Sequence, residues 1–345
     1  MNVYFASYQS VMLLKGGPKT QIIQTKKELE KLGVNVNFFE TWKELNKEKC
    51  DLFHLFGANI GTYHLAREIH KTGIPMVVTP IFFSLHSTKF LRTALYADKF
   101  VRKVFHGLWM DYGFLHDICN WAEAVLPNTE CELKLLEEGL SIPIEKQRVI
   151  PNGVEEKFYN ADGTLFRNKY GVNKFILNVG HIGPARKNVL RLIRAVDEIE
   201  TPIVIIGRIE NNSYGNICIE EAKKNPNILI IDALANDSEL LASAYGACDV
   251  FVLPSLFETP GIAALEAALA GAKIVITKYG GTEEYFGKYA EYVEPTSTAS
   301  IRRGILDALQ KEKQPLLREH IKKEFLWSNV AKKTLDVYKN VLDKK

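Results

Sequence analysis

The sequence has few cysteines, and no stretch of it is apolar enough to cross a membrane. The five cysteines are scattered with no Cys-x-x-Cys pair, which argues against a zinc site or a disulfide scaffold and fits a reducing compartment. No apolar run reaches the roughly 20 residues that a membrane-spanning helix needs. The opening residues, MNVYFASY, lack the basic and then apolar pattern of a secretory leader. We therefore expect a cytoplasmic protein.

Charge of one sign is also scarce. The 345 residues carry a formal net charge of +3, which is too small to indicate nucleic-acid binding, and no RNP, zinc-finger or basic-zipper pattern is present. Hydrophobic residues make up 46% and charged residues 25% of the chain, a balance typical of globular proteins. The length suits two domains of ordinary size.

Short apolar, β-branched runs alternate with amphipathic stretches, pausing at residues 155–172. This alternation predicts parallel sheets flanked by helices. We therefore expect an α/β protein of two doubly wound domains, residues 1–160 and 161–326, followed by a helix within 327–345. The predicted strands are NVYFASY, VNVNFFE, DLFHLFG, PMVVTP, EAVLPNT and QRVIPNG in the first domain, and KFILNVG, PIVIIGR, NILIIDA, DVFVLPS and KIVITKY in the second.

Two glutamates, Glu258 and Glu266, are eight residues apart in the stretch LPSLFETPGIAALEAALAGA. A helical rise separates them by roughly 12 Å, about the length of a sugar–diphosphate–ribose unit. Glu266 falls in an Ala- and Leu-rich run that predicts a mostly buried helix, where an unpaired carboxylate is costly. A ribose diol could bond Glu266 and a sugar ring could bond Glu258. A helix-face glutamate with an incidental partner is the other interpretation.

The same stretch predicts a helix N-terminus after a strand. Thr259 is a good N-cap, Pro260 suits the first helical position, and Gly261 allows a ligand to approach the backbone. The predicted helix runs from Ile262 to Ala270. Because the strand DVFVLPS precedes it, its N–H groups and positive dipole end would meet a phosphate at the carboxyl end of a parallel strand.

These motifs resemble the retaining family-four glycosyltransferases of GT-B fold, over nearly the whole chain and most strongly from Gly180 to Glu284. There PSLFETPGIAALEAALAGAKIVIT is followed by GGTEE. VIPNGVEEKF is similar to the family's stretch near the end of the first domain, and FLWSNVAKKTLDVYKNVLDKK to the helix that crosses back to that domain. The resemblance implies two Rossmann-like domains facing a cleft, the first on the acceptor side and the second binding a nucleotide-diphospho-sugar.

By this resemblance, the loop NVGHIGPARKN contacts the donor diphosphate. Lys187 matches the family's lysine, whereas His181 occupies the place of an arginine. A neutral imidazole lacks the forked, permanent charge of arginine, so either Arg186 compensates or the diphosphate is held more loosely. A solvated loop is the alternative interpretation for Arg186 and Lys187.

The resemblance also implies a front-face displacement, in which the leaving phosphate assists deprotonation of the acceptor. Lys187, Arg186 and the helix N-terminus at Pro260–Ile262 would stabilise charge on the diphosphate, while Glu258 would orient the transferred sugar. No Asp-x-Asp occurs, which argues against a metal-dependent GT-A enzyme. We expect no cofactor and no essential metal, the nucleotide sugar being a substrate.

Candidate residues in the first domain are less distinctive. Gly16 and Gly17 in LLKGGPKT would form the family's Gly-rich loop facing the diphosphate, although a plain tight turn fits them equally well. The family usually has a histidine after the fourth strand, where this sequence has Pro-Ile. His86, a few residues later, is the catalytic candidate, with a loop or packing histidine as the alternative. His54 ends a predicted strand and could also face the cleft.

Positive charge is concentrated in residues 84–110. This segment has a net charge of +4, which leaves −1 for the rest of the chain. Its apolar residues fall close to one helical face, at positions 90, 94, 97, 101, 104, 105, 108 and 112, and its basic residues lie mostly opposite. Such a stretch can lie on an anionic membrane surface, or it can be a domain helix with a solvated basic face.

The sequence therefore predicts a retaining glycosyltransferase that moves a sugar from a nucleotide-diphospho-sugar, with UDP favoured, to a lipid-linked or polysaccharide acceptor. Two alternatives stay open at this point. One is a non-catalytic, transferase-like subunit that binds sugar or acts as a scaffold. The other is a GT-B epimerase or hydrolase acting on a nucleotide sugar.

Overall fold

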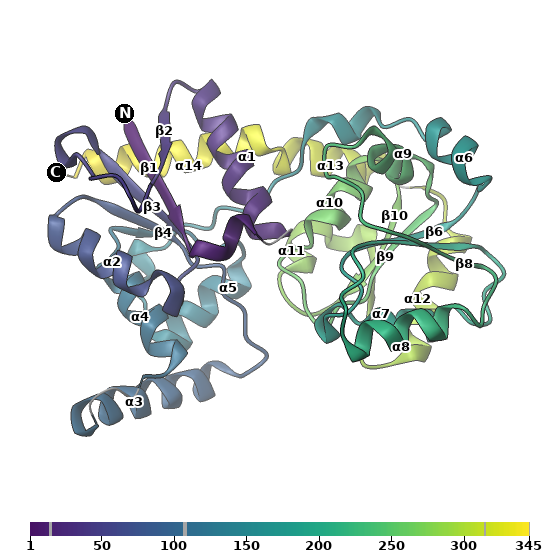
Figure 1. Cartoon of the computed structure of the whole chain (residues 1–345), viewed down its shortest axis with the longest axis horizontal. Helices are drawn as coiled ribbons and strands as arrows, with labels where there is room; N and C mark the ends of the chain where they lie inside the picture. Colours follow the sequence, from purple (N-terminus) through teal and green to yellow (C-terminus); the bar gives the residue numbers. More distant parts are fainter. Residues whose placement is uncertain (14–15, 106–108, 314, 345) are drawn as a thin grey trace. The chain divides into compact units, whose positions relative to one another are not determined.

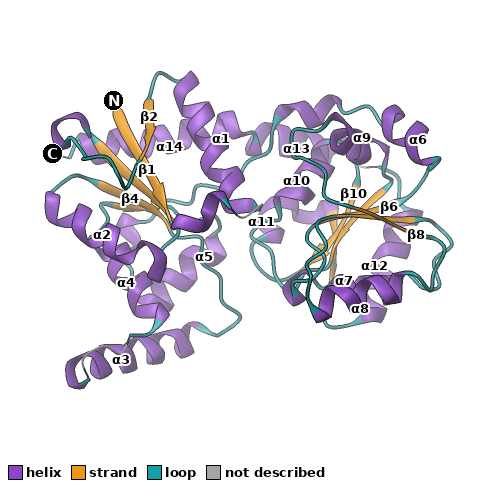
Figure 2. Cartoon of the chain, viewed as in Figure 1, coloured by secondary structure: helices purple, strands orange, loops and turns teal. Residues whose placement is uncertain are grey.

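The structure is a computed structural model that describes residues 1–13, 16–105, 109–313 and 315–344. It contains two compact units. The first domain comprises Met1–Gly153 together with the C-terminal helix from Trp327, and the second domain comprises Val154–Leu326. Each domain has a sheet with helices on both faces (Figure 2).

The first domain is built on a parallel sheet of order β2-β1-β3-β4-β5. Helix α1 packs against α14 on one face, and α2 packs against α4 on the other (Figure 1). The strands are β1 Asn2–Ser7, β2 Asn35–Phe38, β3 Leu52–Phe56, β4 Met76–Thr79 and β5 Ala124–Val125. The helices are α1 Gly17–Lys31, α2 Ile60–Thr72, α3 Thr88–Val104, α4 Asp111–Trp121, α5 Glu130–Lys134 and α14 Trp327–Leu342.

The second domain has a parallel sheet of order β11-β10-β9-β6-β7-β8. The strands are β6 Ile176–Val179, β7 Ile203–Ile206, β8 Ile228–Ile231, β9 Val250–Leu253, β10 Lys273–Thr277 and β11 Ala290–Val293. The helices are α6 Thr164–Tyr170, α7 Val189–Ala195, α8 Ser213–Ala222, α9 Glu239–Ala247, α10 Ile262–Leu269, α11 Thr282–Phe286, α12 Thr298–Gln310 and α13 Pro315–Phe325.

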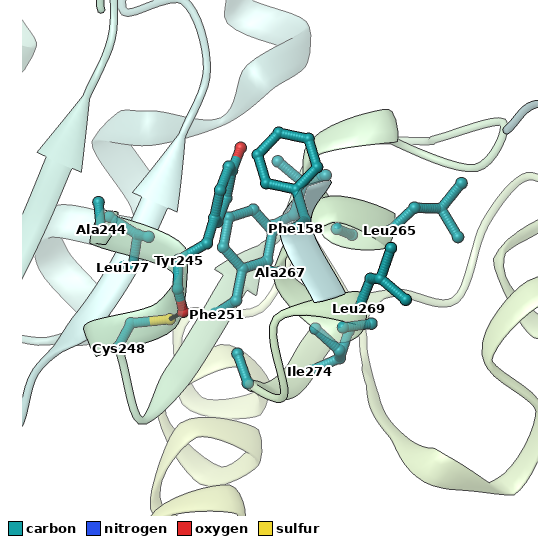
Figure 3. Packing of buried hydrophobic residues seen from close by; sticks show 14 of the residues in the cluster. Phe158, Leu177, Ala244, Tyr245, Cys248, Phe251, Leu265, Ala267, Leu269 and Ile274 are labelled. Atoms are coloured by element: carbon teal, nitrogen blue, oxygen red, sulfur yellow. Dashed lines mark hydrogen bonds between the residues drawn. The ribbon is translucent and has the colours of Figure 1, made fainter. Parts of the chain in front are cut away.

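Alternate residues of the second sheet enter two separate cores. Phe251 and Leu253 of β9 face α9, α10 and α13, whereas Val250 and Val252 face α7, α8 and α12. Because both faces of the strand are covered, all four residues of β9 are buried, which explains its continuous apolar sequence. Figure 3 shows part of the first of these cores, where Tyr245 of α9 packs beside Phe158 and Phe251.

The strands differ from the sequence-based expectations in two places. The described segment QRVIPNG contributes only a bridge between Gln147 and Val125 and no strand. Pro127 and Pro151 lack the N–H groups that a longer ladder would need. Strand β11, a short strand at the edge of the second sheet, was not predicted from the sequence.

The first domain ends at Gly153 instead of residue 160. Gly153 packs on the Trp327 ring, where an added Cβ would lie 2.6 Å from the ring. The backbone N–H of Val154, in contrast, donates to the carbonyl of Phe325 at 2.8 Å, and Phe158 is fully buried in the core of the second domain. The change of domain is therefore set by packing that the polar composition of residues 155–172 does not reveal.

Candidate functional site

Glu258 is held at the carboxyl edge of the second sheet, in the loop between β9 and α10. Its N–H donates to the carbonyl of Tyr279 at 3.0 Å, and its carbonyl accepts from the N–H of Gly281 at 3.1 Å. Gly280 lies against this backbone with φ +100°, and a Cβ there would be 1.8 Å from the Glu258 carbonyl oxygen. Gly280, the first glycine of GGTEE, thus allows the two loops to pair, and this pairing holds the backbone of Glu258 in place.

The Glu258 carboxylate meets two basic side chains from the loop after β6. Lys187 Nζ lies 2.6 Å from Glu258 Oε1, and Arg186 Nη1 lies 3.5 Å from the same oxygen. Arg186 also donates to the carbonyl of Phe257 at 3.1 Å. Burial alone would raise the pKa of Glu258, but the charges of Lys187 and Arg186 hold that pKa below its ordinary value. The site therefore contains an ionised, buried carboxylate beside two cations.

The loop that carries these cations ends in a special backbone conformation. Asn188 has φ +58°, and its side chain donates to the carbonyls of Pro254 and Pro295 at 2.8 and 2.7 Å. Asparagine and glycine tolerate this left-handed conformation better than other residues, so a Lys-Asn pair positions Lys187 over the β9 loop. The tie that Asn188 makes between the two loops was not predicted from the sequence.

The helix after Glu258 begins at Ile262 as predicted, but the predicted N-cap, Thr259, is wrong by two residues. The N-cap is Gly261, whose carbonyl accepts from the N–H groups of Ala264 and Leu265, and Thr259 and Pro260 precede it. Gly261 has φ +84°, and a Cβ there would lie 2.7 Å from Leu253 Cδ2. The pairing of the Glu258 backbone delays the helix, and the glycine then turns the chain into it. The N-terminus of α10 nevertheless follows Glu258 closely, as the motif predicts.

Glu266 lies in α10 and is buried. Its Oε2 accepts a hydrogen bond of 2.7 Å from the hydroxyl of Tyr245. Burial raises the pKa of Glu266 to about 7, although the Tyr245 hydrogen bond acts in the opposite direction. Figure 3 shows the Tyr245 hydroxyl pointing away from Cys248. Tyr245 was missed by the sequence analysis, since nothing in the sequence of α9 marks one of its apolar residues as the partner of a carboxylate.

His181 and its loop are placed beside Glu210. His181 Nδ1 lies 3.6 Å from Glu210 Oε1, and about one third of the His181 side chain is exposed. Gly183, with φ +140°, allows the loop to pass Glu210, where a Cβ would be 2.6 Å from the glutamate Cβ. The structure thus places His181 in the same loop as Lys187, beside an acidic partner. Its contact with a diphosphate stays a prediction.

The candidates in the first domain lie at the carboxyl ends of its strands. Gly16 is the N-cap of α1 and Gly17 is its first residue, both exposed. His86 is exposed in the loop before α3, and its ring stacks on Phe90 at 4.3 Å between centroids. The roles of these residues in transfer stay predictions, as does the expectation of a metal-independent reaction.

His54 has a structural role. It is buried, with Nδ1 2.5 Å from the Tyr338 hydroxyl and Nε2 2.8 Å from Thr79 Oγ1. Burial lowers the pKa of His54 to about 3, so the ring is neutral at physiological pH. The hypothesis that His54 faces a cleft is therefore wrong. One ring nitrogen bonds Tyr338 of α14, and the other bonds Thr79 of β4.

The side of α3 that packs on the domain is not the apolar stripe predicted within residues 84–110. Leu91 and Leu95 are the buried leucines of α3, whereas Phe90, Val104 and Phe105 of the predicted stripe are 49%, 52% and 55% exposed. Most of the predicted apolar stripe therefore faces solvent, because a different side of α3 packs on the domain. Figure 1 shows α3 beyond α4 on this side of the sheet. Leu108, one of the predicted positions, lies outside the described residues.

Arg102 differs from the other basic residues of this segment. Its guanidinium lies 2.6 Å from Asp98 and 2.7 Å from Asp117, and it stacks over Trp109 at 4.2 Å. The positive charge of Arg102 is therefore paired with carboxylates of the same domain. Lys99 and Lys103 are exposed instead, one helical turn apart. Among the described residues, no helix has the length and apolarity to span a bilayer.

Comparison with known proteins identifies relatives of the chain. Residues 165–324 match the family Glycosyl transferases group 1. The uncharacterized glycosyltransferase MJ1607 of Methanocaldococcus jannaschii is 29% identical over 317 residues, which cover 84% of this chain and 73% of that protein. A glycogen synthase of Streptococcus equi is 31% identical over 121 residues, 31% of this chain and only 25% of the synthase.

Solved structures show the same fold over the whole chain. Sucrose-phosphate synthase from Thermosynechococcus elongatus has a TM-score of 0.76 at 16% identity and covers 100% of this chain and 99% of its own. Anabaena HepE in complex with UDP-glucose has a TM-score of 0.70 at 16% identity, and the match covers 99% of this chain and 100% of the HepE chain. The family match, the similarity to MJ1607 and the two-sheet architecture lead to one conclusion: residues 165–324 form a group 1 glycosyl transferase domain, and the chain is a glycosyltransferase of GT-B fold.

Proposed function

We propose that the protein is a retaining glycosyltransferase that uses a UDP-linked sugar and transfers the sugar to a lipid-linked or polysaccharide acceptor. The observation that carries the proposal is the contact of Lys187 and Arg186 with Glu258 beside the N-terminus of α10. This arrangement supplies two cations and helix N–H groups for a diphosphate, and a buried carboxylate for sugar hydroxyls. The solved complex of HepE with UDP-glucose, a protein of the same fold, supports the choice of UDP.

In the proposed reaction, the acceptor hydroxyl attacks the anomeric carbon from the face that the diphosphate leaves. The bond from that carbon to the phosphate oxygen breaks, and the same phosphate takes the acceptor proton. Lys187 and Arg186 stabilise the negative charge that grows on the diphosphate, and they exchange part of their contact with Glu258 for contact with phosphate. Glu258 then accepts hydrogen bonds from the sugar, while Glu266 accepts them from the ribose.

We further propose that the exposed side of α3 holds the protein on an anionic membrane surface. Phe90, Phe100 and Val104 form an exposed apolar stripe, and the exposed Lys99 and Lys103 lie beside it. A helix with an apolar stripe and a basic flank suits the interface of a bilayer that contains acidic lipids. This location would bring the enzyme to lipid-linked acceptors.

Calorimetry and turnover assays on the same proteins test the donor site. UDP should bind the parent protein, and Glu266→Ala should weaken binding at a cost of about 1.5–3 kcal/mol, as expected for lost hydrogen bonds to a charged group. Glu258→Ala and Lys187→Ala should slow transfer from a UDP-sugar, while Lys174→Ala, an exposed lysine of the same domain, should change neither quantity. Unchanged UDP affinity in Glu266→Ala would contradict the ribose assignment.

A panel of nucleotide sugars, with and without membrane extract, separates the alternatives. Transfer that depends on the extract supports a transferase with a membrane acceptor. Release of free sugar or formation of an epimer without any acceptor would instead show a hydrolase or an epimerase. Binding of sugar without turnover of any donor would show a non-catalytic subunit.

A further inference from the structure

The first domain contains a hollow that the donor site does not use. It has a volume of about 880 Å³ and lies at the carboxyl ends of β1 and β2, beside the first turn of α2. Residues from β1 and its following turn, from the loop Phe38–Trp42 and from Ile60–Leu65 line it. This volume lies in the range of ligand sites, and the carboxyl end of a parallel sheet is where such folds bind ligands.

The hollow exists because one connection of the sheet lacks its usual helix. In a doubly wound domain a helix normally follows each strand and covers the sheet. Between β2 and β3, the described residues 39–51 contain only the short 3-10 turn Lys47–Lys49. The ends of β1 and β2 therefore border an open space instead of a packed helix.

Several large apolar side chains around this space are exposed. Trp42 is 100% exposed, and Ile60, Met12 and Phe38 are 63%, 42% and 38% exposed. Grouped exposed apolar residues mark binding surfaces in soluble proteins. Neither the fold nor the donor site explains why Trp42 and Ile60 are apolar.

Charge is absent from the described residues that line the hollow, none of which is Lys, Arg, Asp or Glu. The N-terminus of α2 beside it is also satisfied internally. Asn59 Oδ1 accepts from the N–H of Gly61 at 2.8 Å, and Thr62 Oγ1 accepts from the N–H of Asn59 at 3.2 Å. The lining therefore does not suit a phosphate, and its polar side chains, those of Ser7, Tyr8, Gln9, Thr41 and His64, are outnumbered by apolar ones.

We infer that this hollow binds the neutral, apolar chain of a lipid-type acceptor. The inference rests on the proposed function, since it identifies the acceptor class for the transfer. An uncharged apolar lining matches a hydrocarbon chain, and Gln9, Thr41 and His64 in the same lining can meet the polar end of an amphipathic molecule. The acceptor would thus be selected by its chain as well as by its sugar.

Butyl, hexyl and octyl glucosides, used below their micelle-forming concentrations, are suitable probes. If the chain enters the hollow, affinity should rise by up to about fourfold for each added methylene, the gain expected for burying a CH₂ group. A photoreactive group at the end of the octyl chain should label peptides that contain Phe38–Trp42 or Ile60–Leu65. Free glucose should bind far more weakly than any of the three glucosides.

Variants at exposed positions keep the fold and test the lining. Trp42→Ala and Ile60→Gln should each weaken octyl glucoside binding by about fivefold or more, because both remove apolar contact. The matched control is Ile217→Gln in α8 of the second domain, where the isoleucine is 49% exposed and away from the hollow. The control should bind octyl glucoside like the parent.

Three results would overturn the inference: affinity that does not change with chain length, free glucose binding as tightly as octyl glucoside, or labelling only of segments that do not line the hollow. UDP calorimetry on the same proteins separates this failure from failure of the proposed function. Normal UDP binding without chain-length dependence would reject only the hollow. Chain-dependent binding by a protein that does not bind UDP would leave the hollow intact and reject the donor site.

Discussion

A buried carboxylate can serve two different purposes, and Glu258 and Glu266 differ in this respect. Glu258 is ionised beside Lys187 and Arg186, whereas Glu266 has a hydroxyl partner and a pKa raised to about 7. Their separation in sequence is predictable from the motif, but their opposite electrostatic environments are not. Those environments depend on residues from the loop after β6 and from α9, which lie elsewhere in the sequence.

The raised pKa of Glu266 predicts that UDP affinity depends on pH. A carboxylate accepts hydrogen bonds from a ribose diol better than a carboxylic acid does, so affinity should increase as Glu266 ionises. With a pKa of about 7, roughly a tenth of Glu266 is ionised at pH 6 and nine tenths at pH 8. Calorimetry should therefore show about tenfold tighter UDP binding at pH 8.

The matched control for this measurement is Glu266→Gln, which keeps the side-chain shape and removes the titration. Ionisation of UDP itself contributes equally to both proteins, so the difference between their pH slopes belongs to Glu266. Parallel slopes for the parent and the variant would contradict a role for the ionised carboxylate.

The same residue affects the stability of the unliganded protein. Because the pKa of Glu266 is raised from 4.5 to about 7 on folding, the protonated form stabilises the fold. That contribution is fully present below pH 4.5 and is lost as the pH rises through 7, by about 3 kcal/mol in total. Urea unfolding should show Glu266→Gln gaining stability over the parent between pH 5 and pH 8. A difference that stays constant over this range would exclude the raised pKa.

Among the structural elements, the paired loops after β9 and β10 determine the position of Glu258. Gly280→Ala should place a Cβ against the Glu258 carbonyl at a backbone angle that favours glycine. We expect at least tenfold slower transfer and a loss of about 1–3 kcal/mol of stability. Gly171→Ala is the control, with a similar φ of +68° but nothing within 4 Å of the added Cβ. Equal effects of the two changes on transfer would show that strain alone is responsible.

Helix α3 gives a second prediction at this scale. Lys99→Gln with Lys103→Gln should reduce binding to liposomes that contain acidic lipid, since each lysine near such a surface contributes about 1 kcal/mol. Arg102 is left unchanged because it pairs with Asp98 and Asp117. Salt should weaken the binding of the parent, and UDP affinity should be unaffected by the double change. If the parent protein does not bind acidic liposomes at low salt, α3 is a domain helix whose exposed face lies in water.

At the scale of the whole molecule, the alternation of strands and helices predicts both sheets and ten of the strands in their correct segments. What it does not predict depends on tertiary packing. The QRVIPNG segment has the composition of a strand but forms only one bridge, and the domain boundary follows the packing of Gly153 on Trp327. The exposed face of α3 could not be identified either. Helical periodicity shows that apolar residues share a face of the helix, but it does not show which face packs on the domain.

The candidate site shows the same limit. The motif predicts Glu258, Glu266 and a helix N-terminus in one stretch of the second domain, and the family resemblance adds Lys187. Tyr245 and the tie made by Asn188 become visible only in three dimensions, as does the structural role of His54. These residues contact partners from other helices, strands and loops, and no pattern in the local sequence predicts such partners.

The stereochemistry of transfer tests the central claim most directly. The parent protein should be incubated with a UDP-α-linked hexose and octyl glucoside as acceptor, and the new glycosidic bond followed by NMR from the earliest detectable product. The account predicts an α-linked product and release of one UDP for each bond formed, with both reduced strongly in Lys187→Ala. A β-linked first product, or UDP release without a new glycosidic bond, would contradict a retaining transferase at this site.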